Sequence, residues 1–176
     1  MASLPPLITA DDLIEYGYEA AATKIAAASA RVRRFTRQQI TAGTSTTTLH
    51  GLGPWLLPQR PVIEVTAVVD ANGSDVDHEL DGQMLKSATV CGPLTVTWDH
   101  GFDPLPDGLI ELVCAIAARL AGITTAMAAG VRTEQAGGES VTWGADGWSG
   151  TTGLTRPERE ALREYFPKLP RTVHLL

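Results

Sequence analysis

Residues 50–69 read HGLGPWLLPQRPVIEVTAVV, and this stretch predicts a corner followed by a β-strand. Its first half is a run of Trp and Leu between two prolines, which restrict the backbone and predict a rigid corner. Its second half, Val62–Val69, is rich in β-branched residues and predicts a strand. The corner either packs on the protein's own core or presents apolar side chains to another protein, and we favour the second hypothesis. The candidate residues for contact between subunits are therefore Trp55, Leu56 and Leu57.

Short stretches rich in β-branched or apolar residues lie on both sides of the corner and predict further strands. An Asn72-Gly73 dipeptide, which favours a tight hairpin turn, follows the strand of the corner. Together these segments predict a small antiparallel sheet within residues 44–99. The predicted strands cover residues 44–49, 62–69, 84–85 and 94–98.

Helical patterns lie outside this β region. Thr9 and Thr155 each precede acidic residues in a capping-box arrangement, which predicts that a helix begins at both positions. Apolar residues at helical spacing predict longer helices from about residue 19 to 39 and from residue 106 onward. We therefore predict a mainly α domain, a bundle of about four helices with a small antiparallel β insertion between the second and third long helices.

Two segments near the end of the chain are candidates for contact with other proteins. Residues 129–153 predict a long glycine-rich loop with one short strand, and long loops in compact domains are usually functional or disordered. Trp143 and Trp148 stand among the glycines of this loop; they either fold back on the protein or act as aromatic anchors for a partner. After the last predicted helix, prolines introduce an extended apolar tail at residues 167–176.

The composition fits one domain over residues 1–176. Charged residues make up only 19%, a light charge that is common where partners cover part of a surface. The net charge of −6 disfavours general binding to nucleic acid. The two cysteines form no CxxC pair, and the chain shows neither a secretory signal nor an apolar run long enough for a membrane span. We therefore expect an intracellular origin and no membrane contact.

No strong catalytic or metal-binding motif is present. Asp99 and His100, with Asp103 close by, form the best local cluster for metal or acid–base chemistry. A small intracellular enzyme that uses these three residues is one alternative. The simpler interpretation is a polar turn between a strand and a helix. We expect no catalytic residue, no metal and no cofactor.

The single basic cluster lies near the end of the second predicted helix. Cations at a helix C-terminus interact favourably with the helix dipole and with nearby acids. Contact with a phosphate backbone or an acidic partner is the alternative, and the negative charge of the whole chain favours the first interpretation. The cluster comprises Arg31, Arg33, Arg34 and Arg37.

The order of four stretches resembles the head–tail connector family, also called head-to-tail adaptors, of tailed bacteriophages. The stretches are LITADDLIEYG, LLPQRPVIEVTAV, VTWDHGFDPLPDGLIELVCAIAARL, and VRTEQAGGESVTWGADG followed by LTRPEREALREYF. The resemblance covers nearly the whole chain, and the order of the stretches is its specific part. The Gly- and Trp-rich loop after Trp143 departs from the family's pattern.

The resemblance implies a structural virion protein and not an enzyme. It implies a homo-oligomeric ring, commonly of twelve copies, beneath the portal protein in the virion neck. Such a ring is assembled in the cytoplasm of the bacterial host, extends the channel for viral DNA and contacts the next neck or tail protein, a stopper or tail terminator. Another ring protein of the neck or tail, such as a tail terminator itself, is the alternative.

This expectation assigns partners to the two terminal candidates. An extended apolar tail can add a strand to the edge of a partner's sheet, so the tail is our candidate for contact with the portal. Trp143 and Trp148 are our candidates for contact with the next neck or tail protein. The tail residues are Arg171, Thr172, Val173, His174, Leu175 and Leu176.

Overall fold

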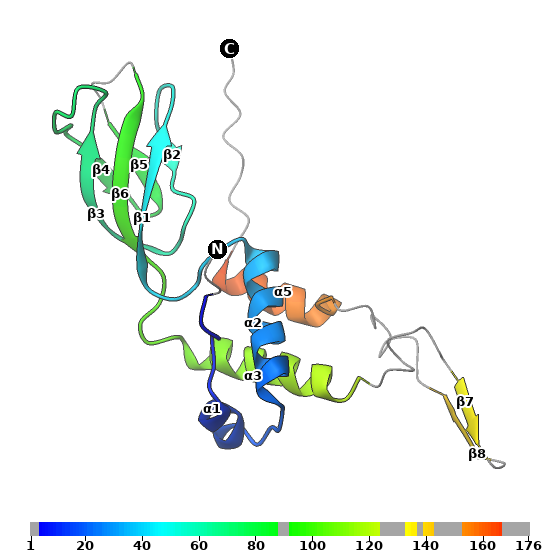
Figure 1. Cartoon of the computed structure of the whole chain (residues 1–176). Coiled ribbons are helices and arrows are strands. Elements are labelled where there is room, and N and C mark those ends of the chain that lie inside the picture. The colour runs from blue at the N-terminus through cyan, green and yellow to red at the C-terminus, as the bar shows by residue number, and fades with distance from the viewer. Residues whose placement is uncertain (1–3, 88–91, 124–132, 137–138, 143–152, 167–176) are drawn as a thin grey trace. The chain divides into compact units, whose positions relative to one another are not determined.

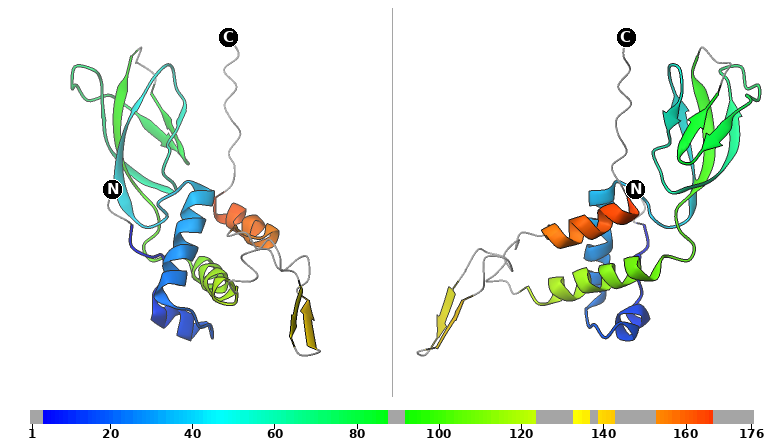
Figure 2. Two further views of the ribbon diagram at one scale, coloured as in Figure 1. Left: turned by 45° about the vertical axis from the view of Figure 1, so that its right-hand side comes forward. Right: turned by 180° about the vertical axis from the view of Figure 1, so that it is seen from behind.

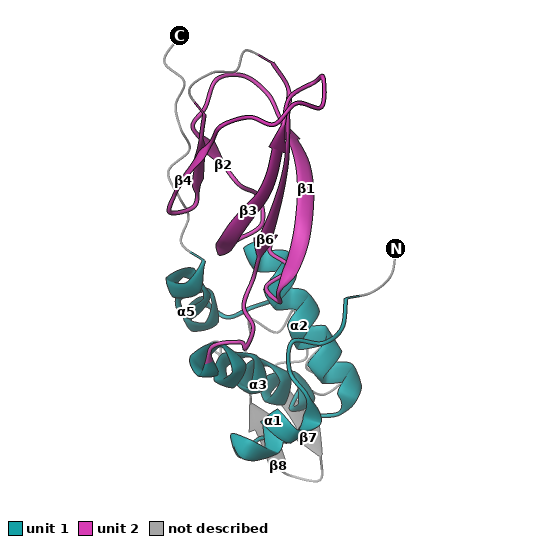
Figure 3. Ribbon diagram, turned by 90° about the vertical axis from the view of Figure 1, so that its left-hand side faces the viewer, with its two compact units in different colours: residues 1–36, 107–176 teal, residues 37–106 magenta. Residues whose placement is uncertain are grey.

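The computed structural model describes residues 4–87, 92–123, 133–136, 139–142 and 153–166, and for residues 133–136 and 139–142 it describes the backbone alone. The chain divides into two compact units (Figure 3). Unit 1 comprises residues 1–36 and 107–176, and unit 2 comprises residues 37–106.

Unit 1 carries helices and one hairpin, and unit 2 carries strands (Figure 1). The helices are α1 (Ala10–Glu15), α2 (Ala22–Thr36), α3 (Asp107–Ala121) and α5 (Arg156–Tyr165), and the hairpin consists of β7 (Thr133–Ala136) and β8 (Glu139–Thr142). The strands of unit 2 are β1 (Gly43–Leu49), β2 (Trp55–Leu56), β3 (Val62–Val69), β4 (Glu79–Asp81), β5 (Met84–Lys86) and β6 (Leu94–His100).

The prediction of a mainly α fold is wrong. The chain is a mixed α/β protein, because its described part holds two three-stranded antiparallel sheets beside four helices. β2 and β4 are absent from the predicted strands, because they have only two and three residues and are too short to show an alternating pattern. With β5 these short strands form a second sheet, in the order β2-β5-β4, beside the sheet β1-β6-β3.

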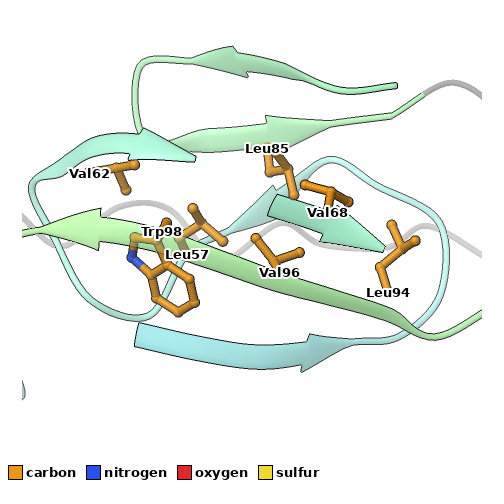
Figure 4. Packing of buried hydrophobic residues seen from close by; sticks show 7 residues of the cluster. All are labelled: Leu57, Val62, Val68, Leu85, Leu94, Val96 and Trp98. Atoms are coloured by element: carbon orange, nitrogen blue, oxygen red, sulfur yellow. The ribbon is translucent and has the colours of Figure 1, made fainter. Parts of the chain in front are cut away.

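The core of unit 2 is apolar and draws on strands of both sheets (Figure 4). β6 is the central strand of its sheet and alternates strictly, with every second side chain buried. Trp98 is the largest fully buried side chain of the described residues. The buried cluster consists of Leu57, Val62, Val68, Leu85, Leu94, Val96 and Trp98.

The chain enters and leaves unit 2 through two paired segments. Phe102 donates its backbone N–H to the carbonyl of Ile40 over 2.8 Å, and Ala42 donates to the carbonyl of Phe102 over 3.1 Å. Gly101 has φ +92°, and a Cβ at this position would lie 2.3 Å from the carbonyl oxygen of Thr41. Both the backbone conformation and the close approach therefore require glycine here.

In unit 1, α2 contacts both α3 and α5 (Figure 2). Both predicted capping boxes are confirmed: Thr9 and Asp12 cap α1, and Thr155 and Glu158 cap α5. The N-terminal arm lies on α2, because Leu7 is buried and donates its N–H to Ser29 Oγ over 2.9 Å. The buried apolar side chains of these helices are Leu13, Ile25, Ala28, Val32, Leu109, Val113, Cys114, Ile116, Ala117, Leu120 and Leu162.

Candidate interaction surfaces

The proline-rich corner is held by the side-chain amide of Gln38. Its Oε1 accepts the backbone N–H of Arg60 over 2.7 Å, and its Nε2 donates to the carbonyl of Pro58 over 3.1 Å. Gln38 is only 5% exposed, so these bonds are shielded from water. The same contacts explain why α2 ends at Thr36 and not at the predicted Gln39: the backbone turns at Arg37, with φ +58°, and the next residue bonds to the corner.

Further bonds fix the corner from both sides. Gln59 accepts the N–H of Gln39 through its side chain (2.8 Å) and the indole N–H of Trp98 through its carbonyl (3.0 Å). Val62 donates its N–H to Gln83 Oε1 over 2.7 Å. Because each of these bonds replaces one that water would make, the irregular backbone between β2 and β3 is satisfied inside unit 2. Hydrogen bonds therefore hold the corner in addition to the restriction that its prolines impose.

The three residues proposed for subunit contact lie in different environments. Leu57 is fully buried in the core of unit 2. Trp55 is half-buried and packs against the same core, whereas Leu56 is 36% exposed. Leu52, in the loop before β2, is 67% exposed. The exposed apolar groups of the corner are therefore Leu52, Leu56 and part of Trp55, which we call the β1–β2 patch.

Trp55 is held in place by its own loop. Its indole Nε1 donates to the carbonyl of His50 over 3.2 Å. Gly53 lies against the ring, since a Cβ on this glycine would approach a ring carbon of Trp55 to 2.7 Å. The ring of Trp55 is thus held by contacts within its own loop.

The outer face of the sheet β1-β6-β3 is lined with hydroxyl groups. Across the strands, Thr44 donates to Asp99 over 2.5 Å and Thr46 lies 2.9 Å from the hydroxyl of Thr97. Thr66 donates to the carbonyl of Thr97 over 3.1 Å. None of the three strands contains Lys or Arg. This face is therefore polar and weakly acidic.

Asp99 and His100 do not form a joint site. Consecutive residues of a strand point to opposite faces, so the Asp99 carboxylate lies on the outer face and the His100 ring on the buried face. His100 is fully buried, with Nε2 2.8 Å from Ser45 Oγ, and burial lowers the pKa of His100 from 6.5 while the charge of Asp99 opposes that shift. Among the described residues, no three His, Cys, Asp or Glu side chains are arranged to hold a metal ion.

The four arginines of the basic cluster have separate environments. Arg33 donates to the carbonyl of Pro5 over 2.7 Å and so helps to hold the N-terminal arm. Burial lowers the pKa of Arg31, and the positive charge of Arg119 lowers it further. Arg34 and Arg37 are exposed. At least one member of the cluster thus has a structural role within unit 1.

The remaining candidates lie outside the described residues. These are Trp143 and Trp148 of the loop, and Arg171–Leu176 of the tail. The predicted strand at residues 139–143 corresponds to β8, which pairs with β7 in antiparallel register. In the described part of the chain, no helix has the length and apolar character needed to span a bilayer.

The fold is similar to that of chains in the neck of a phage-like particle. No family model and no curated protein matches the sequence. Among solved structures, a chain in the neck of an empty gene transfer agent (GTA) particle, computed with C6 symmetry, is similar over 97% of this chain and 95% of its own length, with a TM-score of 0.56 and 17% identity. A chain in the neck of a native GTA particle, computed with C12 symmetry, is similar over 97% of both chains, with a TM-score of 0.53 and 17% identity. The protein has the fold of these neck chains.

The glutamines that hold the corner carry no local signal in the sequence. Gln38 stands directly after the basic cluster, and Gln83 lies in the turn between β4 and β5. Nothing local distinguishes them from exposed polar residues, because their partners are 20 or more residues away in the sequence. The Pro-Gln-Arg-Pro sequence was a signal that the corner needs partners for its backbone.

Proposed function

We propose that this chain is a structural protein of the neck of a phage-like particle, where copies of it form a ring that joins the head to the tail. The observation that carries the proposal is the similarity of fold, over 97% of the chain, to chains in the necks of GTA particles. The similarity includes both units, so it is more than a shared helical bundle or a shared sheet.

The symmetry of those particles supports a ring of twelve copies. A neck computed with C12 symmetry repeats each chain twelve times around one axis, and a ring of twelve also satisfies the C6 symmetry used for the empty particle. Rings use heterologous contacts, in which one surface of a subunit meets a different surface of the next. Each copy therefore needs two distinct contact surfaces.

The β1–β2 patch is one such surface in this proposal. Leu52 and Leu56 are exposed, and hydrogen bonds to Gln38 and Gln83 hold the corner beside them. We place Arg171–Leu176 against the portal protein, and Trp143 and Trp148 against the next neck or tail protein. Deletion of residues 171–176 is expected to weaken binding to the portal, and Trp143→Ala with Trp148→Ala is expected to impair the joining of tails.

The proposed ring surrounds a channel for DNA. The net charge of −6 suits this role, because a channel that bound phosphate groups would hold the DNA and slow its passage. The outer face of the sheet β1-β6-β3, with its hydroxyl groups and without Lys or Arg, is likewise unsuited to binding phosphate.

Native mass spectrometry tests the proposal directly. The chain is measured alone and after mixing with the portal protein from the same genome. A complex with about twelve copies of the chain per portal ring is the expected result. The control is the same mixture with the portal replaced by the tail-tube protein.

Two outcomes would contradict the proposal. Binding to the tail tube and not to the portal would identify a tail-side ring protein, such as a tail terminator. No association with either protein, and no self-association, would exclude a neck ring.

A further inference from the structure

β1 is an edge strand with one open side. It pairs with β6 in unbroken register from Gly43 opposite His100 to Leu49 opposite Leu94. On its other side, no strand of the described residues pairs with it. Such an edge presents a row of backbone N–H and C=O groups that can pair with a strand from another chain.

The other edges of unit 2 are protected. β3 pairs with β6 with two shifts of register, and its far end is covered where Val76 donates its N–H to the carbonyl of Val68 over 2.9 Å. β2 and β4 are only two and three residues long. Bulges and short length are devices by which natural sheets prevent further pairing. β1, with the sequence GTSTTTL, has no charge, no proline and no shift of register.

The hairpin in unit 1 consists of two strands only and would be stabilised by a third. β7 and β8 are four residues long and, among the described strands, pair only with each other. An isolated two-stranded hairpin is marginally stable in water, and a third strand or a packed helix is needed for stability. Within the described part of one chain there is therefore a long open edge and, in a separate sheet, a hairpin without a third strand.

We propose that β8 of one copy adds to the open edge of β1 in the next copy of this chain. The strands then form one continuous sheet across the contact, in the order β7-β8-β1-β6-β3. β8 suits this position better than β7, because it carries two β-branched residues, Val141 and Thr142, whereas β7 carries one, Thr133.

A second copy of the chain fits this edge because every copy can make the same contact with the next one. Each copy donates a hairpin and offers a β1 edge, so the two surfaces differ and the contact is heterologous. Repetition around an axis closes a ring, as the proposed function requires. The inference thus rests on the proposed ring and names the backbone contact that holds its copies together.

Cross-linking tests the contact. Thr46→Cys in β1 and Ser140→Cys in β8 are introduced together with Cys91→Ser, which removes a native thiol; Cys114 is buried. A short bifunctional maleimide is expected to give a ladder of covalent multimers. Mixing the two single variants is expected to give dimers that contain one copy of each, as read by mass spectrometry.

Three outcomes of this experiment would overturn the inference. A cross-linked monomer would place the hairpin on β1 of its own chain. Cross-linked dimers of Thr46→Cys alone would indicate pairing between two β1 edges. Absence of any β1–β8 product, both alone and with the portal protein present, would exclude the contact. If native mass spectrometry still shows a ring in that last case, only the contact is wrong and the proposed function stands.

A matched pair of lysine variants gives an independent test. Thr47 is half-buried on the inner face of β1, where an added strand would cover a lysine, whereas Thr48 is exposed on the outer face. Thr47→Lys is expected to weaken self-association at least about tenfold, and Thr48→Lys is expected to leave it within about twofold. Melting temperatures of both variants report whether each still folds. Equal association by two folded variants would contradict the inference.

Discussion

Arg119 holds Glu158 through two hydrogen bonds, 2.7 Å from Nε to Oε1 and 3.0 Å from Nη2 to Oε2. The same carboxylate accepts the backbone N–H of Thr155 over 2.6 Å and so closes the capping box of α5. The side chain of Glu158 is only 11% exposed. One carboxylate therefore joins α3 to the first turn of α5.

Glu158→Ala is expected to lower the free energy of unfolding by about 2 kcal/mol, because it removes a helix cap and leaves the half-buried Arg119 without its carboxylate partner. The control is Glu160→Ala, which breaks a 2.8 Å pair with Arg156 whose side chains are 54% and 85% exposed. Because water screens this exposed pair, its loss is expected to change the free energy of unfolding far less than the loss of Glu158. Urea unfolding of both variants makes the comparison, and equal losses would contradict the structural role of Glu158.

Gly101→Ala is expected to destabilise the protein by at least about 1 kcal/mol more than Gly73→Ala. Both glycines have positive φ, +92° and +81°, so both substitutions strain the backbone. Only at Gly101 would the new Cβ also meet the carbonyl of Thr41, at 2.3 Å, whereas Gly73 has open space around it. Thermal unfolding of the two variants measures the difference, and a similar loss in both would show that the close approach at Thr41 is relieved at little cost.

Burial of His100 predicts a loss of stability in mild acid. Its pKa in the folded protein lies below the ordinary value of 6.5, so the unfolded chain binds a proton more readily than the folded one. Stability is therefore full above pH 6.5 and falls as the pH drops below it, with a slope of at most about 1.4 kcal/mol per pH unit from this group. Free energies of unfolding from pH 8 to pH 5 are compared with those of His100→Gln. Parallel curves for the two proteins would contradict the assignment.

The two leucines of the corner are expected to separate stability from assembly. Leu57→Ala opens a cavity in the core of unit 2 and is expected to cost about 2–5 kcal/mol of unfolding free energy. Leu56→Ser removes exposed apolar surface and is expected to cost less than about 1 kcal/mol while reducing the copy number seen by native mass spectrometry. If Leu56→Ser assembles like the unchanged protein, the β1–β2 patch is not a contact surface.

Local signals predicted the parts of the fold that depend on neighbouring residues. The strand at Val62–Val69 has the bounds that its β-branched run indicates, and Thr9 and Thr155 cap helices as their sequences predict. α2 ends earlier than predicted because Gln38 bonds to residues about 20 positions away. No local pattern contains that information.

Which side chains are exposed for contact was harder to predict from the sequence. Leu56 and Leu57 are adjacent and chemically identical, yet one is exposed and the other is fully buried. Their difference depends on which side of the corner faces the core of unit 2, and the strand that ends at Leu56 has only two residues and shows no alternating pattern. The sequence also gave no sign that β1 is an edge strand, because strand order follows from long-range pairing.

The bonded crossing of residues 40–42 with Phe102 brings the two ends of unit 2 together. In evolutionary terms, a segment whose two ends lie together can change independently of the residues that flank it. Its interior can lengthen, shorten or be exchanged by recombination while the flanking helices keep their spacing. Changes within residues 37–106 can thus accumulate while residues 1–36 and 107–176 keep their sequence.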